Sequence, residues 1–486
     1  MPTTYEDFVA INPVSVIDQN VWDDKIPEVI MQFQKGPTIY TPLIDWTDRS
    51  AQTGASKSIY TELLEGDTDF DEIEMTAQYI EEPLGVDSRQ RQIGTARYGD
   101  KVQLHESSQI FQMWQQSGGR DWRPLLRGVL GNNVRRKMEY VSRNAYLKGP
   151  KDFWTYGGNA TSWGELSSTD TFDIDIVTDW NLRLGNTGTP IIPGDQAAAK
   201  VAIMPPGATY DFRKSLAAAT GNEAALYTQS RLYAGEAIRY EMGTYENVRF
   251  MEVPNDNYGQ NPAVLYNAGA VTAQATVVSA ITAGDGSPDP ETTKVDETWY
   301  VGQKDVTHYL QLDTGQASDF AKNDWVTIHT VRTSVYGATD GVDPLSGKTI
   351  TRRVVQVDTN NDRIAFDRPI MRKYNTDLGS GVYAYVTKGQ HIGFVLVLGS
   401  RGGILGNVNR PIKFYEPKSI DDFESIFRYV WDIRAGLNLW EPNLFECHFV
   451  PVSLAKPGGI TSPSIVVPGS GSLKVMHGYY SWSVET

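Results

Sequence analysis

A lysine beside a glycine offers the first possible chemistry in this sequence. Gly347, Lys348 and Thr349 end like a phosphate-binding loop, in which backbone N–H groups and the lysine hold a nucleotide. That loop needs a glycine six residues before the lysine, where this sequence has Val342. The residues that follow, 350–357, are β-branched and strand-like, whereas a phosphate-binding loop must open a helix. The segment therefore does not predict nucleotide binding.

An alternating run of aspartates is the second candidate. Asp67, Asp69 and Asp71 have the spacing of the first ligands of a calcium loop. Glu72 stands where that loop needs a glycine for its sharp turn, and Gln78 stands where it needs a bidentate glutamate. These two departures favour a solvated acidic loop tip over a calcium site.

The six histidines and the single cysteine form no pattern of metal ligands. Cys447 and His448 are adjacent, which rarely lets both side chains reach one ion. No serine lies in the glycine-flanked turn of the hydrolases. We therefore expect no metal, no cofactor and no enzymatic activity. An enzyme whose catalytic residues are scattered along the chain stays open as an alternative.

One long basic helix is predicted over residues 121–148. Asp121 can cap its start, Pro124 fits its first turn, and Gly149 follows as a stop signal. Apolar residues recur along it at spacings of three and four. From residue 120 to 151 there are nine basic residues and two acidic ones, a local charge near +7. The arginines either pair with acidic neighbours in the chain or form a surface that faces DNA.

Composition limits the class of protein. A length of 486 residues suggests two to four domains at roughly 150 residues each. One cysteine excludes an intramolecular disulfide and fits synthesis in a reducing cytoplasm. The N-terminus lacks a basic start and an apolar run, so the sequence predicts neither export nor membrane insertion. A net charge of -15 argues against nucleic-acid binding over the whole surface.

Two N-terminal segments do not look able to fold alone. Residues 1–55 predict an arm, with one short helix at 20–34. Residues 56–106 predict an extended hairpin-like loop that is poor in apolar residues and therefore needs a partner surface. Its two limbs carry opposite charges. The charged residues assigned to contacts of this loop are Glu65, Asp67, Asp69, Asp71, Arg89, Arg91 and Arg97.

The rest of the chain mixes both kinds of secondary structure, which predicts an α+β fold. Short strands with turn signals between them fill residues 270–387, and we expect a small β-barrel inserted into the surrounding domain. Outside that region the predicted strands are 201–204 and 390–398, and the predicted helices are 209–219 and 419–428.

Parts of the chain resemble the coat proteins of tailed phages. Residues 123–149, which read RPLLRGVLGNNVRRKMEYVSRNAYLKG, resemble the spine helix of the Hong Kong 97-type capsid fold. Residues 235–255, which read GEAIRYEMGTYENVRFMEVPN, resemble a segment of coat proteins from large podophages and crAss-like phages. The order of arm, loop, helix and closing strands is similar over most of the chain.

The resemblance implies a division into domains. They would be an arm at 1–55, an extended loop at 56–106 and a peripheral domain at 107–175. The first part of an axial domain would follow at 176–269, the inserted barrel at 270–387, and closing segments of both domains at 388–486.

The resemblance also implies a function. The chain would be a major capsid protein that assembles as hexamers and pentamers into an icosahedral head around double-stranded DNA. The extended loop would lie over a neighbouring subunit, and Arg135, Arg136, Lys137 and Arg143 would face the DNA. Portal and head accessory or cement proteins would be further partners, with assembly in the host cytoplasm and final location in the virion.

Two other interpretations remain open. A nanocompartment shell of the encapsulin type would share the fold, although such shells have shorter chains and no large inserted barrel. A carbohydrate-binding or carbohydrate-acting β protein would use Trp299 and Trp325 to stack on sugars, although barrel cores also use tryptophan.

Overall fold

The structure is a computed structural model of the chain. It describes residues 38–48, 57–65, 86–105, 123–149, 151–186, 200–218, 241–245, 248–256, 259–278, 307–330, 332–333, 341–342, 349–360, 362–370, 374, 376–399, 403–419, 426–439, 445–452, 473–474 and 481–482. These residues form several sheets and few helices, so the expected α+β class is confirmed. The predicted helix at 20–34 and the aspartates 67, 69 and 71 lie outside the described residues.

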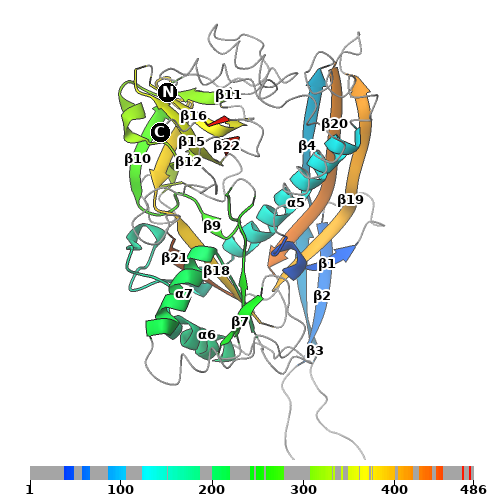
Figure 1. Ribbon diagram of the computed structural model, residues 1–486. Coiled ribbons are helices and arrows are strands. Elements are labelled where there is room, and N and C mark those ends of the chain that lie inside the picture. Colours follow the sequence, from blue (N-terminus) through cyan, green and yellow to red (C-terminus); the bar gives the residue numbers. More distant parts are fainter. Residues whose placement is uncertain are drawn as a thin grey trace, which may run out of the picture.

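A seven-stranded sheet forms the lower body in Figure 1. Its strand order is β5-β21-β18-β6-β8-β7, with β9 also paired to β18. The bounds are β5 (Trp154–Tyr156), β6 (Lys200–Met204), β7 (Glu241–Tyr245), β8 (Val248–Glu252), β9 (Val264–Leu265), β18 (Ile392–Leu398) and β21 (Phe445–Pro451).

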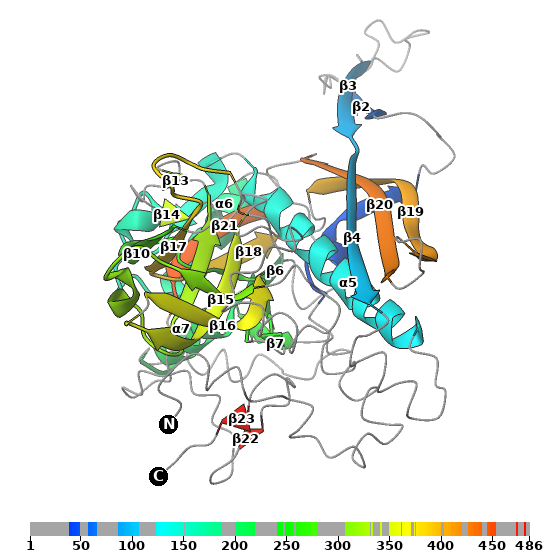
Figure 2. The same ribbon diagram turned by 90° about the horizontal axis from the view of Figure 1, so that it is seen from above.

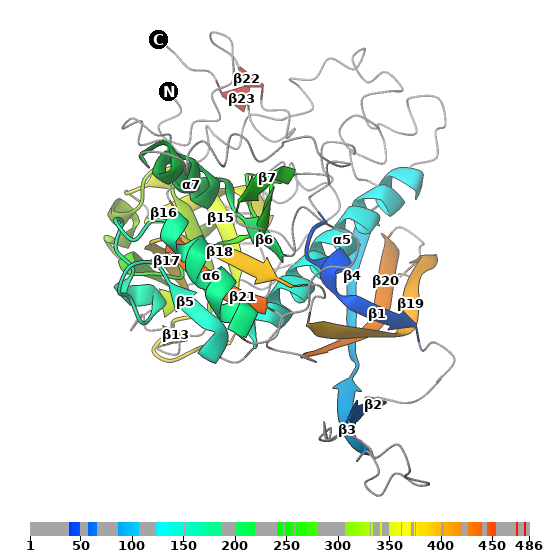
Figure 3. The same cartoon turned by 90° about the horizontal axis from the view of Figure 1, so that it is seen from below.

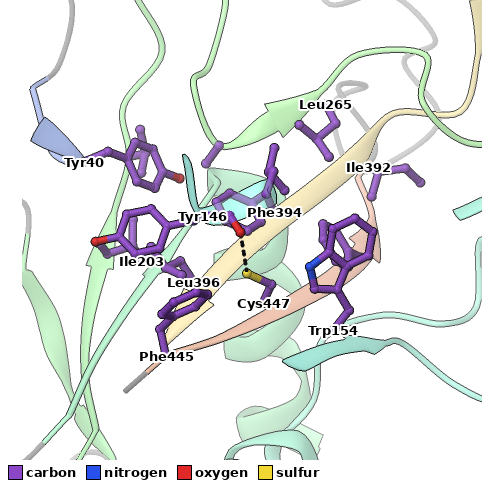
Figure 4. Close-up of a cluster of buried hydrophobic side chains, with 14 of the residues drawn as sticks. Tyr40, Tyr146, Trp154, Ile203, Leu265, Ile392, Phe394, Leu396, Phe445 and Cys447 are labelled. Carbon is purple, nitrogen blue, oxygen red and sulfur yellow. Dashed lines mark hydrogen bonds between the residues drawn. The ribbon is translucent and has the colours of Figure 1, made fainter. Parts of the chain in front are cut away.

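The central strand β18 is buried on both faces, as its unbroken apolar sequence requires. Phe394 and Leu396 contact one core cluster, shown in Figure 4. Val395 and Val397 contact the other, under α6 (Ile174–Asn186) and α7 (Pro206–Ala218).

A second sheet of four strands packs against the longest helix. Its order is β1-β19-β20-β4, from β1 (Asp45–Asp48), β19 (Ile404–Ser419), β20 (Ile426–Leu439) and β4 (Ala96–His105). The helix α5 (Arg123–Leu147) lies along one side of this sheet (Figure 2). Leu130, Val134 and Met138 of α5 pack on Trp431 and Ile433 of β20.

The chain leaves the seven-stranded sheet after β9 and returns to it at β18. Between them lies a six-stranded group of order β10-β17-β12-β15-β16-β11, with its own apolar core. We call this group the inserted β domain. Its strands are β10 (Val271–Val277), β11 (Thr307–Gln311), β12 (Trp325–His329), β15 (Ile350–Asp358), β16 (Arg363–Ile370) and β17 (Ala384–Gly389).

The remaining elements are short, apart from one hairpin. The hairpin joins β2 (Lys57–Glu65) to β3 (Val86–Gly94) and projects from the body (Figure 3). The short elements are η2 (Thr41–Leu43), η3 (Lys151–Phe153), η4 (Trp163–Glu165), η5 (Gln316–Asp319), β13 (Arg332–Thr333), β14 (Gly341–Val342), β22 (Leu473–Lys474) and β23 (Ser481–Trp482).

One predicted element is wrong. A helix was expected over 419–428, but Ser419 ends β19 and 426–428 begin β20. Residues 420–425 lie outside the described residues. The two strands pair at many positions, from Ser419↔Phe427 to Ile404↔Leu439, and this pairing outweighs the local helical pattern of the sequence.

Candidate functional site

The β2–β3 hairpin projects from the rest of the described fold (Figure 3). Its strands pair from Lys57↔Gly94 to Glu65↔Val86, and among the described residues no third strand pairs with them. Figure 2 shows the hairpin standing away from the body, in line with β4. A nine-residue strand spans roughly 30 Å. Because isolated two-stranded hairpins are marginally stable in water, this element needs a surface to lie on.

The root of the hairpin is fixed tightly to β20. Ile93 is fully buried, and the Asn438 side-chain amide donates to the carbonyl of Gln92 at 2.8 Å. A Cβ atom at Gly436 would overlap the carbonyl oxygen of Gly94. Only a glycine therefore lets the hairpin cross β20 this closely.

The sequence that joins the two strands of the hairpin is acidic, and we call this segment the hairpin end. From Glu65 to Glu82 the sequence has eight acidic residues and no basic one. The strands themselves carry Glu65 opposite Val86, Glu62 opposite Arg89, and Tyr60 opposite Arg91 in the register. The backbone thus places Glu65, Arg89 and Arg91 on the hairpin where sequence expected them, while their proposed contacts to a neighbour stay a prediction.

The four-stranded sheet has a basic face on the side away from α5. Along β20, Tyr429, Trp431 and Ile433 pack in the apolar cluster with α5, so the alternate residues point to the opposite face. Arg434 lies on that face, and the register brings β4 and β19 residues beside it. The exposed basic side chains on this face are Arg97, Lys101, Lys413 and Arg434.

One aspartate beneath this face neutralises one of those charges. The carboxylate of Asp432 is almost fully buried and accepts from Arg97 Nε at 2.8 Å and Nη2 at 2.7 Å. The hydroxyl of Tyr415 donates to its other oxygen at 3.1 Å. Arg97, expected to contact another subunit, is therefore paired within its own chain, and we call the remaining set of Lys101, Lys413 and Arg434 the basic face.

The four basic residues assigned to the DNA side of α5 separate into two groups. Arg135 and Lys137 are exposed on the helix. Arg136 forms an ion pair with Asp256 at 3.3 Å. Arg143 is 5% exposed and donates to the carbonyl of Pro262 at 3.1 Å, so the assignment of Arg143 to a DNA-facing surface is wrong. Burial of its guanidinium lowers the pKa of Arg143 from its usual value.

The same helix holds the start of the described chain through Glu139. The Glu139 carboxylate is 1% exposed and accepts from the backbone N–H of Ile39 at 2.6 Å, Tyr40 at 2.7 Å and Thr41 at 3.1 Å. The Thr41 hydroxyl donates to it at 2.9 Å. Sequence reasoning missed this anchor, because donor and acceptor lie about a hundred residues apart.

A buried polar cluster beside β5 resembles a nucleophile with its base. The Thr155 hydroxyl lies 3.0 Å from Glu446 Oε1 and 2.8 Å from His448 Nδ1. Phe172 and Trp180 cover the His448 ring, and burial lowers the pKa of His448 to about 3. Burial also raises the pKa of Glu446. Phe172 and Trp180 belong to the apolar core under α6, so their contacts join the histidine to that core.

Within the part of the chain that the structure describes, histidine, cysteine, aspartate and glutamate side chains nowhere gather in threes that could hold a metal ion. None of its helices combines the length and apolar character needed to cross a membrane.

Comparison with solved structures finds phage capsids. Chains similar to this one come from the capsid of Ralstonia phage GP4 (TM-score 0.46, 10% identity, 88% of this chain and 92% of that one). Another comes from the cyanophage Pam1 capsid (TM-score 0.42, 9% identity, 85% of this chain and 92% of that one). A third comes from the head of Helicobacter pylori bacteriophage KHP40 (TM-score 0.42, 7% identity, 90% of this chain and 94% of that one). No family model and no curated protein matches the sequence. With TM-scores below 0.5, the case for a function has to come from the geometry of this chain.

Proposed function

We propose that this chain is a major capsid protein, which assembles as hexamers and pentamers into an icosahedral phage head around double-stranded DNA. One observation carries the proposal. The described strands of the projecting hairpin lead away from the basic face of the same chain, and the sequence that joins these strands is acidic.

The length and the direction of the hairpin support a contact with a second copy. The hairpin continues the line of β4 outward (Figure 2), and its nine-residue strands run roughly 30 Å from the root, where Gly94 meets Gly436, to Glu65 and Val86. Lys101 lies on β4 on the opposite side of that root, so the last residue of β2, Glu65, is separated from the basic face by more than this length. The acidic end therefore fits the basic face of a second copy. Repetition of such a contact between two different patches generates a closed ring when the rotation from one copy to the next closes, and an open filament when it does not.

The inserted β domain is proposed as a closed barrel on the outside of the head. Support comes from contacts between the first and last strands of its order. Val277 forms a bridge with Leu312, and Val278 donates to the carbonyl of Gln311 at 3.2 Å. The sequence assigned residues 1–55 and 56–106 to neighbouring copies. Because β1 and β4 pair within the four-stranded sheet of their own chain, this proposal limits the part that reaches a neighbouring copy to the β2–β3 hairpin and its joining segment.

Contact with DNA is proposed for Arg135 and Lys137 of α5, which are exposed. Arg135 and Lys137 remain available, whereas Arg136 and Arg143 hold other parts of the chain. Changing Arg135 and Lys137 to glutamate should reduce genome retention, because phosphate contacts depend on these charges. Assembly of empty shells should continue. Loss of empty shells instead would assign both residues to subunit contacts.

Electron microscopy of the purified chain tests the proposal most directly. We expect closed shells, tubes or sheets of hexamers. A variant lacking residues 66–83 serves as the matched comparison, because it removes the acidic end and leaves the strands of the hairpin. It should give a soluble subunit without shells. A wild-type chain that stays strictly monomeric at high concentration contradicts a capsid protein, and normal shells from the deletion contradict the role of the hairpin end.

A further inference from the structure

A hydrogen-bonded path runs from α5 to the inserted β domain. It starts at Arg136, whose Nη2 lies 3.3 Å from Asp256 Oδ2 and donates to Gln260 Oε1 at 3.2 Å. The amide of the same Gln260 side chain donates to the carbonyl of Thr351 on β15 at 2.8 Å. Gln260 is 6% exposed, so both ends of its amide are held away from water. One side chain thus joins the helix to the domain.

The loop that carries Gln260 is itself fixed on both sides. We call residues 253–256 and 259–267 the bridge loop. Asp256 Oδ1 accepts from the Gln260 N–H at 2.8 Å, and the Asn261 side chain donates to the carbonyl of Val253 at 2.7 Å. On the helix side, Arg143 donates to the carbonyl of Pro262 at 3.1 Å. The bridge loop is therefore built as a rigid element between α5 and β15.

A second set of bonds locks the base of the domain to the same loop. Asn267 has a φ of 57°, a left-handed conformation that costs energy in residues other than glycine, and it is fully buried. Its side chain donates to the Thr327 hydroxyl at 2.8 Å and accepts from the Gly389 N–H at 3.0 Å. These two partners lie on β12 and at the end of β17. The cost of the conformation is offset by bonds to both strands.

The face of the domain that meets the loop is buried and combines polar and apolar contacts. Along β12, the side chains of Trp325, Thr327 and His329 point out of the core of the domain, and Thr327 and His329 are about 1% exposed or less. Trp325 packs on Val264 and Tyr266 of the bridge loop. Because hydrogen bonds have directions, the polar contacts fix the orientation of the domain more sharply than the apolar packing alone would.

We infer that α5 positions the inserted β domain through the bridge loop, so that helix and domain move as one body. The domain is then attached rigidly to α5, and it does not move independently on two flexible linkers. This inference concerns the single subunit and does not depend on the proposed capsid function. Within a shell, any displacement of α5 would be carried to the domain.

Hydrogen exchange of the full chain, followed by mass spectrometry, tests the coupling. Gln260→Glu keeps an acceptor for Arg136 but places a carboxylate oxygen against the Thr351 carbonyl, so it breaks only the hydrogen bond to the inserted β domain. Arg136→Gln breaks only the contacts between α5 and the bridge loop. Arg135→Gln, at an exposed neighbouring position on α5, is the matched control. Loss of one hydrogen bond of ordinary strength changes exchange by roughly three- to tenfold.

We expect both Arg136→Gln and Gln260→Glu to raise exchange by that factor in peptides covering 325–329 and 350–354, while Arg135→Gln does not. Exchange in β18 and β21 should stay at the wild-type rate, which shows that the core is intact. Faster exchange confined to α5 and the bridge loop in Arg136→Gln overturns the inference. Faster exchange that extends to β18 and β21 also overturns it, because the arginine then supports the whole fold.

Discussion

Glu139 and His391 are two residues whose side chains affect the stability of this chain. Glu139 accepts three backbone N–H groups and one hydroxyl inside the protein. Glu139→Ala leaves those donors buried without a partner and should lower the unfolding free energy by about 3 kcal/mol. Lys137→Ala, an exposed change on the same helix, should stay within about 0.5 kcal/mol. Urea unfolding of both variants measures the difference, and equal midpoints would show that the anchor contributes nothing.

Burial of His391 makes stability depend on pH. Burial lowers the pKa of His391 to about 4, although Asp324 acts in the other direction, whereas an unfolded histidine titrates near 6.5. Below pH 6.5 the unfolded chain therefore binds a proton first. The stabilisation is complete above pH 6.5 and is lost as the pH falls towards 4, by up to about 1.4 kcal/mol per pH unit.

The variant His391→Asn isolates this effect. Asparagine keeps an oxygen that can accept from the Asn267 N–H, as His391 Nδ1 does at 3.2 Å, but it does not titrate. Its unfolding free energy should therefore fall less steeply between pH 6.5 and 4. Some slope will remain, because burial also lowers the pKa of His448. Identical slopes for variant and wild type would count against a titrating His391.

The sequence alone could not show which arginines of α5 are exposed and which are buried or paired. The sequence correctly placed Arg135, Arg136 and Arg143 on one helix, since apolar spacing fixes the helix. It could not show that Arg143 is buried or that Arg136 meets Asp256, because those contacts join positions more than a hundred residues apart. The basic face was missed for the same reason: its members come from β4, β19 and β20 and meet only through strand pairing.

Among the elements, the hairpin depends on one glycine. Gly436→Ala would push a methyl group into the Gly94 carbonyl and should displace the root of the hairpin. We expect a folded subunit that assembles far less readily than wild type. Gly94→Ala is the matched control, because a Cβ there meets open space. Circular dichroism checks the fold and light scattering measures assembly. If the two variants assemble equally well, the position of the hairpin root does not affect assembly.

Elements with strong local patterns were predictable, and those set by pairing were not. The helix expected at 121–148 is found as Arg123–Leu147, and the strand expected at 201–204 as Lys200–Met204. The expected helix at 419–428 failed, because β19 and β20 satisfy each other's backbone groups along their length. Short polar stretches beside long strands carry too little local preference to resist such pairing.

At the scale of the whole molecule, charge is divided between an acidic stretch of sequence and the basic face. The net charge of -15 contains a stretch with eight acidic residues and no basic one from Glu65 to Glu82. The basic face of Lys101, Lys413 and Arg434 is exposed in the single subunit. If one copy docks on the next through these surfaces, assembly should weaken as salt rises, because exposed charges are screened within about 10 Å at 0.1 M ionic strength.

Reversing both charges gives the sharpest test of that division. Asp67, Asp69, Asp71, Glu72 and Glu74 changed to lysine leave three acidic and five basic residues from Glu65 to Glu82, so the segment becomes basic and should prevent assembly by repelling the basic face. Lys101, Lys413 and Arg434 changed to glutamate should also prevent it. A chain carrying all eight changes has a basic segment and an acidic face, so complementarity returns and shells should reappear. Sedimentation and electron microscopy compare the three variants under identical conditions. Failure of the eightfold variant, with its subunit folded by circular dichroism, would mean that these two surfaces do not contact each other in the assembled particle.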